Sequence, residues 1–208
     1  MRCGMSAASM QGRRAARPIL RQAGVAAVEF GILAVLFFTM VLAVIELARV
    51  MFVFNTLYEV TRQAADAAAF TSHRDTDALD RIRQRAVFRD SPGNLLISAP
   101  VSDESVRIRY LALLRASDGA MTMQEIPASS LPTCPRNNRE ICLADPNASN
   151  CIRFVSASIC DEADQDECDH VVYRPFLPLI TFPIGLPKAT TIRAVESFGS
   201  MPEGTPCL

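Results

Sequence analysis

The sequence predicts an α+β protein, in which a long N-terminal helix precedes a small domain with an antiparallel sheet. Three observations predict this class. An apolar run, Val25–Ile45, continues without a break into a helical pattern. Later segments alternate apolar and polar residues, as half-buried strands do. Six of the seven cysteines follow residue 130, which is typical of a small domain stapled by disulfides.

Residues 1–24 form a basic leader. No acidic residue precedes Glu29, whereas five arginines do, and without them 16 basic residues remain against 22 acidic ones. A basic flank before an apolar helix predicts an N-terminus in the cytoplasm and a body on the other side of the membrane. The acidic body argues against nucleic-acid binding, which usually requires a basic surface.

Residues 25–70 are expected to form one helix. Its first part, Val25–Ile45, contains a single charged residue, Glu29. At about 1.5 Å per residue this run is roughly 31 Å long, which matches the hydrocarbon core of a bilayer. Beyond it, apolar residues recur at steps of three and four, so the helix becomes amphipathic outside the membrane. A break is expected near residues 71–74.

The remaining segment, 71–208, is the predicted periplasmic α+β domain. A second helix is expected to begin with Asp75 or Thr76 as its N-cap and to end before the turn at 91–94. Its predicted buried residues are Leu79, Ile82, Ala86 and Val87. Strands are expected at 105–114, 120–126, 152–159, 171–173 and 190–198, with a hairpin turn at Asp118–Gly119. Residues 127–150 and 160–170 are expected to be loops.

The cysteines of the domain predict disulfides. They are Cys134, Cys142, Cys151, Cys160, Cys168 and Cys207, and six cysteines allow fifteen pairings. The short, turn-rich loops favour Cys160–Cys168 first and Cys134–Cys142 second, which leaves Cys151–Cys207 by elimination. Reduced, buried cysteines are the alternative. A zinc site is disfavoured, because no two cysteines have the spacing of a zinc-binding pair.

Nothing in the sequence predicts catalysis, a metal or a cofactor. No nucleophile elbow, zinc-protease motif or glycine-rich phosphate loop is present in the sequence. The acidic residues around Cys160 and Cys168 could bind calcium, but they lack the glycine and the twelve-residue spacing of a calcium loop. A solvated acidic loop is the favoured interpretation. Glu46 and Arg49 fit either a contact between subunits or, preferably, a surface ion pair.

Glu29 is the residue that most needs an explanation. A carboxylate at the centre of a bilayer costs about 2.5–3.5 kcal/mol, so such residues are rare and usually functional. Glu29 lies only one turn from Val25, so an interfacial side chain without a function is one interpretation. However, Glu29 is the fifth residue after Gly24, behind an arginine-rich leader, and Phe30 follows it. This layout resembles the processing site of type IV prepilins.

A longer stretch resembles one family more closely. The segments "AGVAAVEFGILAVLFF" and "IELARVMFVFNTLYEVTRQAADAAA" resemble the TadE-like proteins, which are minor pilins or pseudopilins of the tight-adherence (Flp) pilus system. The resemblance implies that a prepilin peptidase cuts between Gly24 and Val25. It further implies that Glu29, followed by Phe30, neutralises the Val25 ammonium group of a neighbouring subunit during assembly. Small residues would let such helices pack closely.

The predicted function is therefore structural. The chain is expected to be a single-pass minor pilin, pseudopilin or assembly component of the bacterial inner membrane, with its C-terminal domain in the periplasm. The implied partners are the prepilin peptidase, other pilin-like subunits, the inner-membrane assembly platform and lipid. One alternative is an uncleaved, signal-anchored periplasmic binding module. Another is a soluble protein released by cleavage after Ala43. The cleavage site separates the three.

Overall fold

The computed structural model describes residues 23–95, 101–162, 168–175 and 185–195. It divides into two units whose boundary lies between Ile45 and Glu46. The predicted α+β class is confirmed: a long apolar helix comes first and a small antiparallel sheet follows it.

Helix α1 (Ala23–Ala69) is one continuous helix of 47 residues, as the unbroken apolar and amphipathic pattern predicts. Alanine has the highest helix propensity, and its concentration after residue 63 favours the helix up to its end. The helix ends in tight turns, in which the N–H groups of Phe70 and Thr71 donate to the carbonyls of Ala67 and Ala68. In the second unit, its buried residues face the sheet and α2.

Helix α2 (Thr76–Ala86) begins as predicted. The side chain of Asp75 caps it by accepting a hydrogen bond from the Ala78 N–H at 2.9 Å. Leu79, Ala86 and Val87 are buried, so the apolar face that the spacing predicts is the face that packs. The helix ends at Ala86, and Phe88, two residues later, has a positive φ of 59° that changes the direction of the chain.

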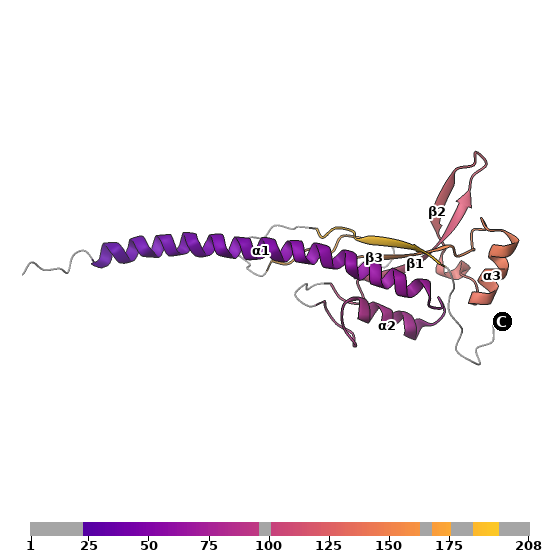
Figure 1. The fold of residues 1–208 in the computed structure, drawn as a ribbon, viewed down its shortest axis with the longest axis horizontal. Helices are drawn as coiled ribbons and strands as arrows, with labels where there is room; N and C mark the ends of the chain where they lie inside the picture. The colour runs from indigo at the N-terminus through magenta and orange to yellow at the C-terminus, as the bar shows by residue number, and fades with distance from the viewer. Residues whose placement is uncertain (1–22, 96–100, 163–167, 176–184, 196–208) are drawn as a thin grey trace, which may run out of the picture. The chain divides into compact units, whose positions relative to one another are not determined.

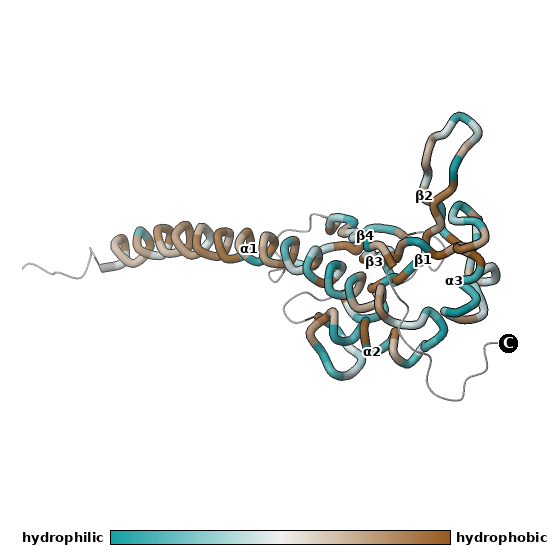
Figure 2. The backbone as a smooth tube through the Cα atoms, turned by 45° about the vertical axis from the view of Figure 1, so that its right-hand side comes forward, coloured by the Kyte–Doolittle hydropathy of each residue, from teal (hydrophilic) through white to brown (hydrophobic). Residues whose placement is uncertain are grey.

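The sheet has four antiparallel strands in the order β2-β1-β3-β4 (Figure 1). The strands are β1 (Val106–Arg115), β2 (Met121–Glu125), β3 (Phe154–Ile159) and β4 (Thr190–Ala194). A hairpin joins β1 to β2 where the sequence predicts it, and Gly119 supplies the positive φ of 88° that its turn requires. Figures 1 and 2 both show this hairpin extending beyond the rest of the sheet.

The core lies between one face of the sheet and the two helices. One cluster joins Val53, Leu57 and Val60 of α1 to the residues of β1 and β3 that point inward. A second cluster joins the end of α1 and Leu79 of α2 to Tyr110, Ala112 and Val155. Figure 2 shows apolar residues along the N-terminal half of α1 and in the strands of the core.

Two regions differ from the sequence-based prediction. The expected loop at 127–150 contains a 3-10 turn, Ala128–Ser130, and a helix, α3 (Pro135–Ala144). Helix α3 is capped by the sulfur of Cys134, which accepts from the Asn137 N–H, and Pro135 occupies its first turn. The expected strand at 171–173 is reduced to a single bridge between Val172 and Gly185.

The disulfide pairing is partly as predicted. Cys160 is bonded to Cys168, which confirms the first expected pair. Cys142 is bonded to Cys151, so the expected Cys134–Cys142 and Cys151–Cys207 pairs are wrong. The reason is α3, which brings Cys142 close to the start of the segment leading into β3. Cys134 is also disulfide-bonded, and Cys207 lies outside the described residues.

Candidate membrane and assembly segment

The first unit presents an apolar surface along α1. Between Gly24 and Ile45 every described side chain is exposed except that of Ala34, which is partly buried. So many exposed apolar side chains are unfavourable in water, because burying one large apolar side chain stabilises a protein by about 1.5–3 kcal/mol. In the described part of the chain, α1 is the one helix long and apolar enough to cross a membrane. This finding is consistent with a membrane anchor.

The single hydroxyl group within this run is satisfied locally. Thr39 Oγ1 donates to the carbonyl of Val35, one turn earlier, at 2.7 Å. A polar group in hydrocarbon needs such a partner, because water is absent there. Thr39 therefore fits the bilayer interior without any partner from a neighbouring chain. Glu29 is then the strongly polar side chain of this segment that still needs an explanation.

The four residues expected to act in processing and assembly lie in the first turns of α1. Gly24 and Val25 are the second and third residues of the helix, and helix ends fray. Glu29 is four residues after Val25, so the two lie one above the other on one face. Phe30 is 73% exposed beside them. The structure brings these residues together, while their roles in cleavage and assembly stay predictions.

Three small residues of the segment lie on the other side of the helix. Ala27, Gly31 and Ala34 are spaced by four and three residues and share one face, whereas Glu29 points away from it by helix geometry. A methyl group built on Gly31 meets no atom of this chain within 4 Å. A larger side chain at Gly31 is therefore not excluded by the chain's own packing.

At the start of the second unit, a polar cluster fixes α1 to the later part of the chain. The Tyr173 hydroxyl donates to Glu46 Oε1 at 2.6 Å, and Arg49 Nη1 donates to the carbonyl of Arg174 at 3.1 Å. Arg49 also pairs with Glu46 at 3.4 Å and lies 5.2 Å above the Tyr173 ring. Burial, aided by the bond to Glu46, raises the pKa of Tyr173 to about 12.

The intrachain interpretation of Glu46 and Arg49 is confirmed, whereas a contact between subunits stays a prediction. Their side chains form the expected i,i+3 ion pair within one chain, and they are only 24% and 16% exposed. The pair also holds Tyr173, a partner that the sequence pattern does not reveal. The spacing of Glu46 and Arg49 predicts their ion pair. Tyr173 lies more than 120 residues later, and no pattern in the sequence predicts that it contacts them.

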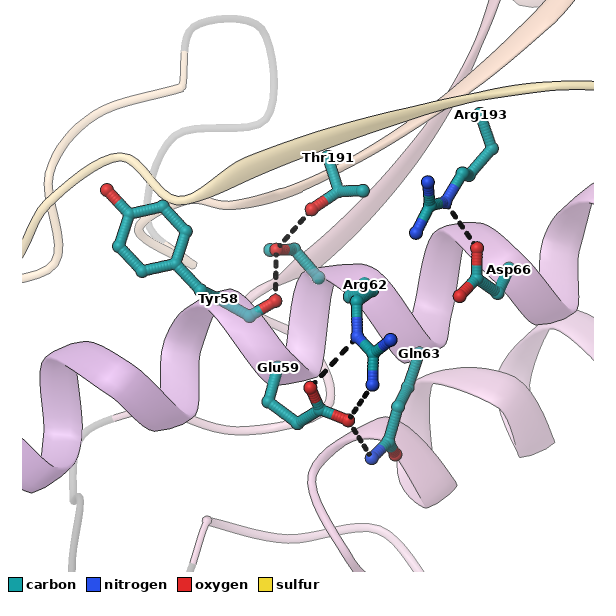
Figure 3. Close-up of polar contacts among 8 residues, drawn as sticks. Tyr58, Glu59, Arg62, Gln63, Asp66, Thr191 and Arg193 are labelled. Carbon is teal, nitrogen blue, oxygen red and sulfur yellow. Dashed lines mark hydrogen bonds and ion pairs between the residues drawn. The ribbon is translucent and has the colours of Figure 1, made fainter.

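A second set of contacts joins α1 to β4 (Figure 3). The hydroxyl groups of Thr61 and Thr191 are hydrogen-bonded at 2.9 Å, and Arg193 forms an ion pair with Asp66 one turn further along α1. Thr61 is fully buried, so its bond satisfies a polar group inside the core. These contacts between distant segments were missed by sequence analysis, because β4 follows α1 by more than 120 residues.

Another charged group lies on α1, close to Asp66. Arg62 donates to both carboxylate oxygens of Glu59, at 3.0 and 3.1 Å, and Gln63 donates to Glu59 at 2.9 Å (Figure 3). The hydrogen bonds from Arg62 and then Gln63 lower the pKa of Glu59. This exposed ion pair contributes little to stability, because water and salt screen the attraction between the two charges.

The other predicted positions lie elsewhere. Among the described residues, no group of three or more His, Cys, Asp or Glu side chains could hold a metal ion. Three of the acidic residues considered for calcium lie outside the described ranges. Glu162 accepts hydrogen bonds from the hydroxyl groups of Ser102 and Ser105, so it is engaged in holding its own loop.

Comparison with known proteins supports the resemblance for the N-terminal helix. Residues 24–66 match the model of a family described as TadE-like protein. The match covers Gly24 to Asp66, and therefore includes the apolar run, Glu29, the Glu46–Arg49 pair and the Glu59–Arg62 pair. No curated protein and no solved structure matches the chain. The family match and the exposed apolar helix fit a membrane protein associated with the tight-adherence pilus.

Proposed function

We propose that this chain is a minor pilin, pseudopilin or closely related assembly component of the tight-adherence pilus, held in the bacterial inner membrane by α1. The observation that carries the proposal is the match of residues 24–66 to the TadE-like family, over a helix whose apolar side chains are exposed. In this proposal the C-terminal unit lies in the periplasm and performs no catalysis.

The proposed mechanism begins with cleavage between Gly24 and Val25 by a prepilin peptidase. Cleavage leaves an ammonium group on Val25, four residues from the Glu29 carboxylate. An isolated charge in the low dielectric of a membrane is costly, so each group is stabilised by an opposite charge. When a second subunit packs alongside, the Glu29 carboxylate neutralises the Val25 ammonium of that neighbour. This pairing would fix the axial register between adjacent helices.

The small residues of α1 support close packing in such an assembly. Inside a bilayer the hydrophobic effect does not drive helices together, because the lipid tails are themselves apolar. Helices associate there through van der Waals contacts and hydrogen bonds, and small side chains allow their backbones to approach closely. Ala27, Gly31 and Ala34 present such a face, and Gly31 has no intrachain neighbour that needs the space. Since Glu29 lies on the opposite side, one helix can contact one neighbour through the carboxylate and another through the small face.

The first test is the N-terminus of the mature protein. The protein is purified from membranes of its native host and analysed by intact mass and N-terminal sequencing. We expect a mature chain that starts at Val25. A retained leader would contradict processing and favour the uncleaved, signal-anchored binding module, and a start after Ala43 would favour a released soluble protein.

A second measurement tests the role of Glu29. We expect Glu29→Gln, which removes the charge but keeps the shape, to reduce pilus assembly at least tenfold, because the Val25 ammonium group then lacks its partner. Glu29→Asp keeps the charge and should retain most of the assembly. Sheared pili are quantified alongside the mature N-terminus, so that a defect in processing is distinguished from a defect in assembly. Normal assembly by Glu29→Gln would refute the charge-pairing mechanism.

A further inference from the structure

Among the described residues, strand β2 is at the edge of the sheet. It is the terminal strand in the order β2-β1-β3-β4, and all five of its side chains are exposed. Met121 and Met123 are 51% and 54% exposed, which is unusual for two large apolar side chains on neighbouring positions of one strand face. No strand among the described residues pairs with the outer edge of β2.

The hairpin register shows which backbone groups this edge presents. The Ala116 N–H donates to Ala120 at 2.8 Å, and the Ile126 N–H donates to Tyr110 at 2.9 Å. Hydrogen-bonded pairs alternate along an antiparallel ladder, so Thr122 and Gln124 direct their backbone groups toward β1. The N–H and C=O groups of Met121, Met123 and Glu125 therefore point outward.

This edge lacks most of the features that normally prevent strands from pairing, although β2 has only five residues and ends with the charged Glu125. Protective edge strands carry lysine, proline, a bulge or an inward charge. The sequence of β2, Met-Thr-Met-Gln-Glu, has no lysine, arginine or proline. Its pairing with β1 advances one residue at a time from Leu111–Glu125 to Arg115–Met121, without a bulge. The strand is thus a regular template for another extended strand.

We propose that β2 pairs in antiparallel fashion with β2 of a second copy of this chain, around a two-fold axis at Met123. This inference does not depend on the proposed function. Only one register aligns all three outward-facing residues with outward-facing residues of the other copy. In it, Met123 faces the partner's Met123, and Met121 faces the partner's Glu125. Each such pair exchanges two backbone bonds, so the edge gains about six hydrogen bonds.

The side chains are complementary in this register. Leu113 and Met123 are direct cross-strand partners, so the central row becomes an apolar strip of leucine, methionine, methionine and leucine across the two copies. In the flanking rows, Glu125 of one copy shares a face with Arg115 of the other, with the partner's Met121 between them. No like charges stand opposite each other. A self-complementary patch of this kind is what a two-fold interface requires.

Cysteine crosslinking of the full chain in membranes tests the register. At the two-fold axis the two Met123 Cα atoms would lie about 5.5 Å apart, within the range of a disulfide. The two Met121 Cα atoms would be displaced by four residues, about 14 Å along the strands. We expect Met123→Cys to form a disulfide-linked dimer under mild oxidation, at least fivefold more than Met121→Cys or the hairpin-tip variant Ser117→Cys. The unsubstituted chain controls for the native cysteines.

Co-expression of Met121→Cys with Glu125→Cys supplies a positive control for the same register. Because residue 121 faces residue 125 of the other copy, the mixture should form a dimer that neither variant forms alone. Equal crosslinking at 117, 121 and 123, or no crosslinking at 123, would overturn the proposal.

A backbone variant tests the edge itself. Proline at 123 removes an outward N–H and no bond to β1, so Met123→Pro is expected to keep the hairpin while blocking the dimer. Met123→Ala keeps every backbone group and should retain most of the association. Dimerisation is measured by sedimentation of the detergent-solubilised full chain, and circular dichroism checks the fold. We expect at least a tenfold rise in the dimer dissociation constant for Met123→Pro. An unchanged constant, or a wild-type chain that stays monomeric, would refute the pairing of β2 edges.

Discussion

At the scale of single residues, His73 shows how burial creates a pH-dependent contact. His73, in the turn that follows α1, is 6% exposed, and its Nε2 lies 2.7 Å from the Pro132 carbonyl. Its ring meets the Tyr110 ring edge-on at 5.8 Å between centroids. Burial lowers the pKa of His73, and the charge of Arg74 lowers it further, although the Pro132 carbonyl opposes the shift.

The direction of this shift predicts how stability changes with pH. Since the native pKa lies below the unfolded value of about 6.5, the unfolded chain takes up a proton first as the pH falls. The free energy of unfolding should therefore decrease between pH 7 and pH 5. His73→Gln keeps a donor for Pro132 but cannot titrate, so it should lose part of this decrease. Urea unfolding of both proteins in detergent, at both pH values, measures the difference. Identical pH dependence would contradict the prediction.

Residue-scale prediction from sequence succeeded where the signal was local. The Glu46–Arg49 pair was predicted because helix geometry brings residues i and i+3 together. Glu29 was singled out because it interrupts an apolar run, and its role stays a prediction. Tyr173 and Thr191 were not identifiable, because their partners on α1 are set by how β4 and the preceding segment pack. Contacts of this kind depend on tertiary structure, so the spacing of residues along the sequence does not predict them.

At the scale of elements, α3 depends on one buried side chain. Asn138 Oδ1 accepts from the Ile152 N–H at 2.8 Å, and its Nδ2 donates to the Ile152 carbonyl at 3.3 Å. Asn138 is 6% exposed, so it satisfies two backbone groups at the entrance to β3 that water reaches poorly. Together with the Cys142–Cys151 disulfide, this contact attaches α3 to the sheet.

Removing that side chain should destabilise the C-terminal unit. Asn138→Ala leaves the N–H and C=O groups of Ile152 without their partner, and an unsatisfied buried group costs about 1–3 kcal/mol. We expect a loss of about 2 kcal/mol in the free energy of unfolding, measured by urea denaturation. The neighbouring, exposed Arg139→Ala should change it by less than about 0.5 kcal/mol. Equal effects of the two variants would contradict this role for Asn138.

Periodic elements were predictable and α3 was not, for a physical reason. Helix α2 and strand β1 show their buried face directly in the spacing of apolar residues, and Asp75 is a common N-cap. Helix α3 has little apolar periodicity, two adjacent asparagines of low helix propensity and a cysteine as its cap. Without α3, nothing in the sequence places Cys142 beside Cys151, so the pairing of these cysteines was predicted wrongly.

At the scale of the whole molecule, the surfaces of the two units suit different environments, a membrane for the first and water for the second. The first unit exposes apolar side chains that water does not favour, and the second has a packed core and two disulfides in its described part. Disulfides persist in oxidising compartments, which include the bacterial periplasm. The arginine-rich leader favours a cytoplasmic N-terminus. These features agree on one orientation, which we argue as a prediction.

Reporter fusions measure that orientation directly. Alkaline phosphatase, which is active only after export, should be active when it is fused after Leu208, whereas a green fluorescent protein exported by the same route should stay dark.

The orientation depends on the leader because lysine and arginine near an apolar helix are retained on the cytoplasmic side. Replacing Arg13, Arg14, Arg17 and Arg21 with glutamate should therefore lower phosphatase activity several-fold at equal protein level. The matched control reverses four arginines of the C-terminal unit, Arg81, Arg85, Arg136 and Arg139, and should leave export unchanged, because distant charges contribute little to orientation. Fluorescence from the C-terminal fusion would place this unit in the cytoplasm and contradict both the topology and the periplasmic part of the proposed function.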